Sequence, residues 1–297
     1  MTERDLRIGV VGLPQSWSTE ILADAFETRT GYRLIVDMGK VALDLARGKA
    51  DIGGVNLCRL DGLVVKKVTS EYSPDTLDRI ELLRFVEGAG VRVFSPAASI
   101  GRLIDRLSCT VTLRNAGIPM PPTVITEDIG RATRAVKSFG TAILKPLYST
   151  KARGMEVIDT RTENDIEGRL RRFQESNRVL YVQKKIDVPG QDLGIAFLGG
   201  EHVGTYARVI GEGAWNTTIF SGGRYAPHTA SASTIEIARS AQAPFGLDFT
   251  TVDVVETADG PVVFEVSAFG GFSGLKASAG INAAELYADY VIKTLTS

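Results

Sequence analysis

Histidine and cysteine are almost missing from this sequence of 297 residues, which contains two of each. The cysteines, Cys58 and Cys109, are far apart and lack the spacing of a zinc site, so we expect neither a disulfide framework nor a zinc centre. The histidines, His202 and His228, have no neighbouring catalytic motif, which favours structural roles for both. This residue usage fits a protein of the reducing cytoplasm best.

Long apolar runs and a strong net charge are missing as well. No stretch approaches the roughly 18 consecutive apolar residues of a membrane-spanning helix, and the chain does not begin with the apolar run of a signal peptide. The formal net charge is -1 at pH 7, which argues against a general nucleic-acid binder. We therefore expect a protein that binds neither membranes nor nucleic acid.

The composition that remains is typical of a folded globular protein, with 44% hydrophobic and 23% charged residues. The length allows two or three modules. In the N-terminal third, short apolar runs alternate with helical patterns, which predicts a mainly parallel βαβ sheet. The strands of this sheet are expected at 7–11, 33–36, 51–55, 62–65 and 90–94.

The rest of the chain predicts a mixed α+β structure. Between residues 96 and 187 we expect helices at 99–116, 128–139 and 163–175, and strands at 142–146, 155–158 and 179–186. After Pro189-Gly190 we expect strands at 193–198, 202–209 and 215–219, two further strands around Asp253 and Glu265, and helices at 231–245 and 283–295. The fold class is thus α/β followed by α+β.

Lys145 and the loop after it carry the first functional signal. Lys145 ends a predicted strand, and the loop 148–154 that follows combines small residues with Lys151 and Arg153. Small residues let backbone N–H groups approach an anion, and the cations add charge-assisted hydrogen bonds. The pattern therefore predicts a polyphosphate site, although a lysine at the end of a strand can also simply face solvent.

Two acidic residues on predicted neighbouring strands carry the second signal. Asp253 and Glu265 lie on either side of the turn Asp259-Gly260, and each is flanked by β-branched apolar residues. Carboxylates on paired strands can share a hard cation such as Mg²⁺. We predict a metal site here; the alternative is a pair of carboxylates that face solvent.

The order of these and other motifs resembles the ATP-grasp superfamily, particularly its glutamate ligase branch, which includes the ribosomal-protein glutamyl ligase and the tetrahydromethanopterin glutamate ligase. The resemblance extends over roughly residues 95–295. Its landmarks are 104–106, 117–123, 144–147, 182–186, 192–193, 206–208, 222–223, 247–254, 264–266 and 278–281. It implies an ATP-grasp fold with a pre-ATP-grasp βαβ domain at 1–95, a central module at 96–187 and a C-terminal module with the metal site at 188–297.

The resemblance also implies the site residues. Mg-ATP would lie between the central and C-terminal modules, with Lys145 and Arg208 as the catalytic cations. The residues expected to bind ATP are Arg106, Lys145, Ser149, Thr150, Lys151, Arg153, Gln183, Lys184, Lys185, Ile186, Asp192, Asn216, Thr217 and Thr218. Mg²⁺, with Mn²⁺ as an alternative ion, would be held by Asp253, Glu265 and Ser267.

The activity implied by the resemblance is the ATP-dependent joining of a carboxylate to an amine through an acylphosphate. The substrates would be L-glutamate and a small carboxylate-bearing cofactor, first a tetrahydromethanopterin-type pterin, or a peptide. Many relatives form dimers or tetramers, so a homo-oligomer is compatible with the resemblance. Two alternatives stay open: a catalytically weakened protein that binds nucleotide or pterin as a scaffold or sensor, and a small-molecule kinase of the same fold.

Several positions depart from the family pattern. Arg106 replaces the first phosphate-binding lysine, and Ser149 and Ala152 replace glycines of the loop over the phosphates. Gly194 stands where the family has an arginine, and Ser267 where it has an asparagine, with Thr218 in place of another asparagine. These changes reduce the charge near the transferred phosphate and the reach of one metal ligand, so they put the catalytic rate in question.

Overall fold

The N-terminal part forms a parallel sheet, as the sequence predicts. The computed structural model describes residues 6–297. The strand order is β2-β1-β6-β7, and each neighbouring pair is parallel. The strands are β1 (Ile8–Val11), β2 (Ile35–Val36), β6 (Gly62–Val65) and β7 (Arg92–Phe94), and the helices are α1 (Trp17–Thr30) and α2 (Asp75–Gly88). Gly31 ends α1 with a φ of 72°, a conformation that glycine adopts without steric cost.

One predicted strand of this part, 51–55, is wrong. The chain instead reverses at Gly53-Gly54, whose φ angles of 56° and 84° suit a hairpin turn. The result is a separate antiparallel sheet of β3 (Ala42–Asp44), β4 (Lys49–Ile52) and β5 (Val55–Asn56). Two 3₁₀ turns, Met38–Lys40 and Leu57–Arg59, flank this small sheet.

The helix predicted at 99–116 is broken into α3 (Ala97–Ile104) and α4 (Arg106–Asn115). Asp105 lies between them in an extended conformation, and its carboxylate accepts a hydrogen bond of 3.0 Å from the N–H of Leu107. Aspartate is a favoured N-cap, so the sequence starts a second helix here. The break places Arg106 at the first turn of α4, beside the loop that follows Lys145.

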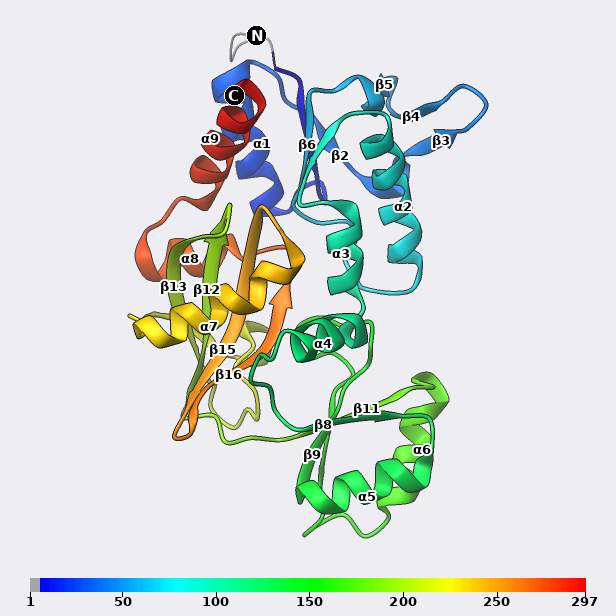
Figure 1. Ribbon diagram of the computed structural model, residues 1–297, viewed down its shortest axis with the longest axis vertical. Coiled ribbons are helices and arrows are strands. Elements are labelled where there is room, and N and C mark those ends of the chain that lie inside the picture. The colour runs from blue at the N-terminus through cyan, green and yellow to red at the C-terminus, as the bar shows by residue number, and fades with distance from the viewer. Residues whose placement is uncertain (1–5) are drawn as a thin grey trace.

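The central module is a four-stranded antiparallel sheet of order β10-β9-β11-β8, covered by two helices. Figure 1 shows it at the bottom of the molecule, below α4. Its elements are β8 (Thr123–Thr126), α5 (Ile129–Phe139), β9 (Thr141–Leu144), β10 (Glu156–Asp159), α6 (Ile166–Ser176) and β11 (Leu180–Lys184). Its core is separate from those of the other parts and includes Val136, Leu144, Leu170, Phe173 and Val182.

The C-terminal module is a five-stranded antiparallel sheet of order β14-β13-β12-β15-β16. The strands are β12 (Gln191–Leu198), β13 (Glu201–Val209), β14 (Arg224–Pro227), β15 (Phe249–Thr257) and β16 (Gly260–Ser267), and α7 (Ala232–Gln242) with the 3₁₀ turn Ala243–Phe245 packs against them. The strand predicted at 215–219 is wrong. Asn216 Oδ1 accepts the Thr218 N–H at 3.0 Å, and such a local hydrogen bond diverts the backbone from a ladder.

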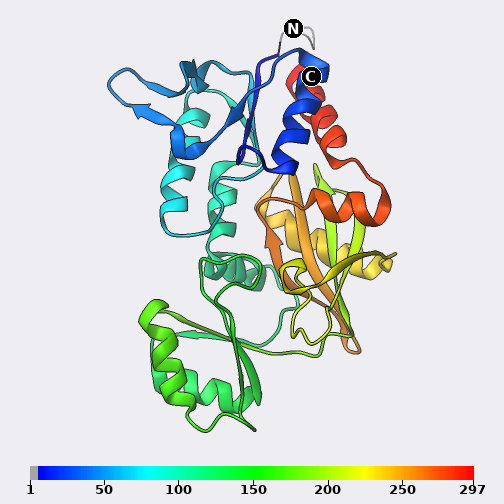
Figure 2. The ribbon, with the colours of Figure 1, turned by 180° about the vertical axis from the view of Figure 1, so that it is seen from behind.

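The last two helices return the chain to the N-terminal part. They are α8 (Phe272–Ala279) and α9 (Ala283–Thr296), and α9 lies beside α1 in both views (Figures 1 and 2). Arg29 of α1 binds Asp289 of α9 at 2.6 Å, and Tyr287 and Val291 are buried between the parts. Within residues 6–297, the structure contains no helix with the length and apolar character needed to cross a membrane.

Asp248 connects three parts of the molecule, and we expect its loss to destabilise the fold. Its carboxylate accepts hydrogen bonds from the backbone N–H of Ser95, from Arg92 at 3.5 Å and from the Tyr290 hydroxyl at 2.9 Å. Asp248→Ala leaves the buried Ser95 N–H unpaired and removes the acceptor of Arg92 and Tyr290, so the free energy of unfolding in urea should fall by about 1–3 kcal/mol. Glu175→Ala on the exposed face of α6 is the control, with an expected change below about 0.5 kcal/mol. Equal unfolding midpoints for the two variants would contradict this role of Asp248.

Candidate functional site

Lys145 is buried at the end of β9, with 8% of its surface exposed. Its backbone N–H donates to the Tyr181 carbonyl at 3.0 Å, which fixes the residue against β11. The ammonium donates to Gln183 Oε1 at 2.5 Å and lies 5.7 Å from the centre of the Phe264 ring. Burial, with a smaller contribution from Arg106, lowers the pKa of Lys145 to about 7, and Glu265 opposes this shift. No carboxylate of residues 6–297 is recorded within ion-pair distance of this buried ammonium, so the position suits a phosphate ligand.

Gln183 positions that ammonium. Its side chain is 3% exposed, accepts from Lys145 and donates from Nε2 to the Thr123 hydroxyl at 2.9 Å. The resemblance would place Gln183 in the segment that lines adenine. In the structure its side chain is instead turned toward the Lys145 ammonium.

Arg106 links the central module to the C-terminal one. Its guanidinium donates to the carbonyl oxygens of Pro146 at 3.1 Å and Ser149 at 3.4 Å, and to Glu265 Oε2 at 3.1 Å. The segment between β9 and β10 runs back to α4, as Figure 2 shows, and the Arg106 N–H donates to the Leu147 carbonyl at 3.1 Å. Basic groups of the central module and a carboxylate of the C-terminal module thus share one cluster.

Asp253 and Glu265 are paired directly across β15 and β16. The register shifts beyond this pair, so Phe264 forms a β-bulge that places its ring beside Lys145. Asp253 Oδ1 is buried and has no hydrogen-bond partner among residues 6–297. Burial raises the pKa of the Asp253 carboxyl, Arg208 opposes this, and Glu265 adds to it. A cation at this pair of carboxylates would supply the missing partner for Oδ1.

The donor set fits Mg²⁺ held by few protein ligands. Ser267 lies two residues beyond Glu265 on β16, opposite Thr251, so its side chain points to the same face as the two carboxylates. Residues 6–297 contain no cluster of three or more histidine, cysteine or acidic side chains that would make a closed metal cage. Mg²⁺ does not need one, because it is commonly held by one or two carboxylates with water and phosphate oxygens.

Arg208 lies between two aspartates. Its guanidinium binds Asp192, the residue opposite it in register, through Nε at 3.0 Å, and it binds Asp253 Oδ2 at 2.8 Å. Burial disfavours the charge on Arg208, but Asp253 and Asp192 outweigh burial and raise its pKa well above the ordinary value. Asp192 is 3% exposed, so in this structure its carboxylate serves Arg208 rather than an open ribose site.

Close packing against Tyr206 explains the glycine at position 194. Gly194 is paired with Tyr206, and a Cβ at Gly194 would lie 2.3 Å from the Tyr206 ring. A Cβ at Gly274 of α8 would lie 2.6 Å from the same ring. Tyr206 therefore fills the volume that the family's arginine would enter, and Arg208 is left as the cation of this strand pair beside Asp253.

The loop 148–154 is strained and attached to the N-terminal part. Lys151 and Ala152 both have a φ of 58°, a conformation that costs a residue other than glycine about 1 kcal/mol or more. The Ser149 hydroxyl donates to the Arg153 carbonyl at 2.6 Å, and the Arg153 N–H donates to the Thr150 carbonyl at 3.2 Å. The Arg153 guanidinium binds Glu71 at 2.7 Å. Of the two positions where the family has glycine, Ala152 thus coincides with backbone strain and Ser149 does not.

The segment 183–186, which the resemblance would place beside adenine, has few free backbone N–H groups. The Lys184 N–H donates to the Pro122 carbonyl at 2.8 Å, and the Lys185 N–H donates to the Thr141 carbonyl at 2.9 Å. This segment can therefore contact a base through the carbonyl oxygens of Lys184 and Lys185 and through the backbone of Ile186. Lys184 is exposed at the end of β11, so its side chain is not directed into the core.

The Asn216 to Thr218 segment is not joined to the charged cluster by the contacts that the structure records for residues 6–297. Asn216 Oδ1 accepts from the Thr218 N–H at 3.0 Å and from its hydroxyl at 2.7 Å. Thr217 is buried, and the Thr218 hydroxyl also contacts Ser221. These hydrogen bonds stay within the loop between β13 and β14.

Sequence reasoning missed two residues of the N-terminal part that lie near this cluster. The Lys66 ammonium donates to the Gly270 carbonyl at 2.8 Å, and the Tyr72 ring packs edge-on against Phe269 at 6.4 Å between centroids. Burial raises the pKa of Tyr72, and the Glu265 charge adds to this rise. Lys66 carries the same signal as Lys145, a lysine directly after a buried strand, but no motif pointed to it.

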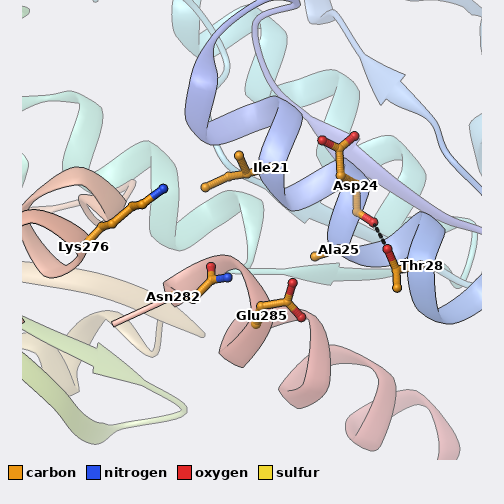
Figure 3. Close-up of a pocket in the computed structure, with 7 residues that line it drawn as sticks. All are labelled: Ile21, Asp24, Ala25, Thr28, Lys276, Asn282 and Glu285. Carbon is orange, nitrogen blue, oxygen red and sulfur yellow. Dashed lines mark hydrogen bonds between the residues drawn. The ribbon is translucent and has the colours of Figure 1, made fainter. Parts of the chain in front are cut away.

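A hollow of about 230 Å³ lies elsewhere, between α1 and the start of α9. Figure 3 shows Asp24 and Thr28 of α1 facing Asn282 and Glu285, with Lys276 of α8 at the edge. It is open to solvent and shares no residue with the predicted nucleotide and metal sites. The chemistry is therefore expected at the charged cluster and not in this hollow.

Comparison with known proteins points to one family. The family model described as the RimK-like ATP-grasp domain matches residues 104–291. The tetrahydromethanopterin:alpha-L-glutamate ligase of Methanosarcina acetivorans is 24% identical over 94% of this chain and 96% of its own length. A probable alpha-L-glutamate ligase 2 of Shewanella amazonensis is 25% identical over 98% of this chain and 97% of its own length.

Solved structures resemble the whole chain. The ATP-grasp ligase PsnB, in a complex with a phosphomimetic variant of its minimal precursor, Mg and ADP, superposes with a TM-score of 0.75, covering 99% of each chain at 19% identity. A RimK domain ATP-grasp protein from Sphaerobacter thermophilus gives a TM-score of 0.73, covering 96% of this chain and 99% of its own at 22% identity. At these identities the similarity shows the fold.

Proposed function

The chain belongs to the RimK-like ATP-grasp family, and from this premise we propose that it is an ATP-dependent carboxylate-amine ligase that releases ADP. The proposed amino-acid substrate is L-glutamate, and the proposed acceptor is a small carboxylate-bearing cofactor of the tetrahydromethanopterin type or a peptide. The names of the relatives support the glutamate and pterin assignments. The peptide alternative is supported by the precursor bound in the PsnB complex.

The observation that carries the proposal is the shared charged cluster. Lys145 and Arg106 of the proposed central unit, 96–187, meet Glu265 of the proposed C-terminal unit, 188–297. Asp253, with its unpartnered buried oxygen, adjoins Glu265 in register. Cations from one unit and carboxylates from the other are what a Mg-triphosphate held between them requires.

Mg-ATP would supply the γ-phosphoryl group that activates a carboxylate for attack by an amine. Asp253, Glu265 and Ser267 would hold the metal, and Lys145 would bind phosphate oxygens. Glu265 engaged with a metal ion no longer needs Arg106, whose planar fork then suits phosphate oxygens. Arg208 is held charged beside Asp253 and would stabilise negative charge that develops during transfer. The loop 148–154 would exclude water.

Mass spectrometry of the products tests the proposal. The protein is incubated with ATP, Mg²⁺, a panel of amino acids and candidate pterin and peptide acceptors. We expect an acceptor that gains the mass of glutamate less water, together with stoichiometric ADP. Reactions that lack the amine or ATP are the controls. An acceptor that gains only a phosphate would instead show a kinase, and nucleotide binding without any product would indicate the scaffold or sensor.

A further inference from the structure

Lys66 is a buried cation that the proposed nucleotide and metal sites do not use. It directly follows β6, and its backbone N–H donates to the Val11 carbonyl at 2.8 Å. The residue is 6% exposed. Its ammonium donates to the Gly270 carbonyl at 2.8 Å and lies 4.4 Å from the centre of the Phe272 ring. Among residues 6–297, no carboxylate is recorded within ion-pair distance of Lys66.

Burial of the Lys66 ammonium without a bound anion costs free energy. An ammonium has three donors, and the recorded hydrogen bonds of Lys66 occupy one of them. Burial, with a smaller contribution from Lys67, lowers the pKa of Lys66 to about 7. A methionine of similar length would fill the same volume without desolvating a charge. A retained, under-satisfied cation is therefore best explained by an anion that binds to it.

Lys66 is also placed at the site. Gly270 belongs to the loop that follows β16 and Ser267, and the next N–H, that of Gly271, donates to the Thr251 hydroxyl at 3.2 Å. Thr251 lies two residues before Asp253 on β15 and on the same face. A chain of contacts thus connects the strand of the proposed metal ligands, through Thr251 and the 270–271 backbone, to Lys66. Close packing holds this loop against the sheet, because a Cβ at Gly270 would lie 2.3 Å from the Phe249 ring.

We propose that Lys66, beside the 269–271 loop, binds a carboxylate of the ligase substrates. The proposal rests on the ligase function proposed above, because that reaction brings a carboxylate-bearing amino acid and a carboxylate-bearing acceptor to one centre. The N-terminal part then serves substrate recognition, while Lys145 and Arg106 serve the nucleotide.

The test compares wild type with Lys66→Met and Lys66→Gln by calorimetric titration. L-Glutamate, the other common amino acids and glutarate are each titrated into protein saturated with Mg²⁺ and a non-hydrolysable ATP analogue. We expect at least one of these carboxylates to bind wild type about 10- to 100-fold more tightly than either variant, with unchanged affinity for the ATP analogue. Lys67→Met is the matched control and should change carboxylate affinity less than about twofold. Lys66→Gln keeps a neutral donor for Gly270, so it separates loss of charge from loss of a structural contact.

The opposite pattern overturns the inference. Equal affinity for every tested carboxylate in wild type and variants, including no binding to any, would exclude the proposed site, as would a loss confined to the ATP analogue. Both variants should melt at the wild-type temperature or above it, because a desolvated charge is removed. A lower melting temperature together with unchanged carboxylate affinity would show that Lys66 only anchors the loop.

Proton uptake gives a second readout. Lys66 has a pKa of about 7, and Lys67 is the charged neighbour recorded to affect it within residues 6–297. A bound carboxylate favours the charged ammonium, so at pH 8 wild type should take up a proton on binding and Lys66→Met should not. Calorimetry in two buffers of different ionisation enthalpy measures this, and equal uptake in both proteins would count against the site. If both Lys66 variants bind carboxylates more weakly than wild type, but wild type forms no product with any acceptor, the carboxylate site is supported and only the ligase proposal fails.

Discussion

Replacing Lys145 with methionine is expected to weaken Mg-ATP binding by about 100-fold or more, because a buried cation in contact with phosphate contributes several kcal/mol. Methionine keeps the length of the side chain and its contact with Phe264, so the change isolates the charge. Titration calorimetry gives the affinity. Lys184→Met is the control, because Lys184 is exposed and only its backbone is expected to meet the base. Normal affinity in Lys145→Met would remove the proposed phosphate contact.

Lys145→Met is expected to stabilise the folded protein, although it weakens Mg-ATP binding. The pKa of Lys145 is about 7 in the folded protein, against an ordinary value of 10.5, so between these pH values the unfolded chain binds more protons. Burial of this lysine therefore lowers wild-type stability fully below pH 7, and the penalty disappears as the pH rises toward 10.5. Lys145→Met should unfold at a higher denaturant concentration than wild type at pH 7, and the difference should shrink at pH 9–10. A variant that is less stable at pH 7 would show that the Gln183 contact outweighs burial of the charge.

The main features of the fold follow from local sequence patterns. The parallel sheet came from the alternation of short apolar runs with helices, and the β15–β16 hairpin from apolar strands on either side of Asp259-Gly260. That hairpin brings the strands of Asp253 and Glu265 together, but its register alone would pair Asp253 with Phe264, so the pairing of Asp253 with Glu265 depends on the bulge. The ordered motifs supplied the family, which the model match over 104–291 confirms.

Features that depend on how distant segments pack could not be predicted. The Lys66 contact with Gly270 joins residues 204 positions apart, and no periodicity encodes it. The bulge at Phe264 and the break at Asp105 each depend on a single residue. The apolar pattern around that residue predicts an unbroken strand or helix. Ion pairs across modules, such as Arg106 with Glu265, also require the modules to be placed relative to each other.

Glu265→Gln separates metal-assisted transfer from nucleotide binding, and we expect it to lower amine-dependent ADP release by about 10³-fold, since a metal ion at the transferring phosphate contributes several kcal/mol to the barrier. Affinity for ATP should fall less than about tenfold, because the phosphate contacts of Lys145 remain and Arg106 is freed from its carboxylate partner. Turnover is measured with the substrates that the product analysis identifies, and affinity by calorimetry.

The control for this prediction is Glu236→Gln on the exposed face of α7, which should leave both quantities unchanged. Asp253→Asn is expected to be at least as damaging to turnover, because it removes charge from the carboxylate whose Oδ1 has no protein partner. It also weakens the ion pair with Arg208, so its effect on stability must be measured in parallel. If Glu265→Gln reduced ATP affinity and turnover by the same factor, Glu265 would act in nucleotide binding alone and the assignment of the metal site to the β15–β16 pair would be wrong.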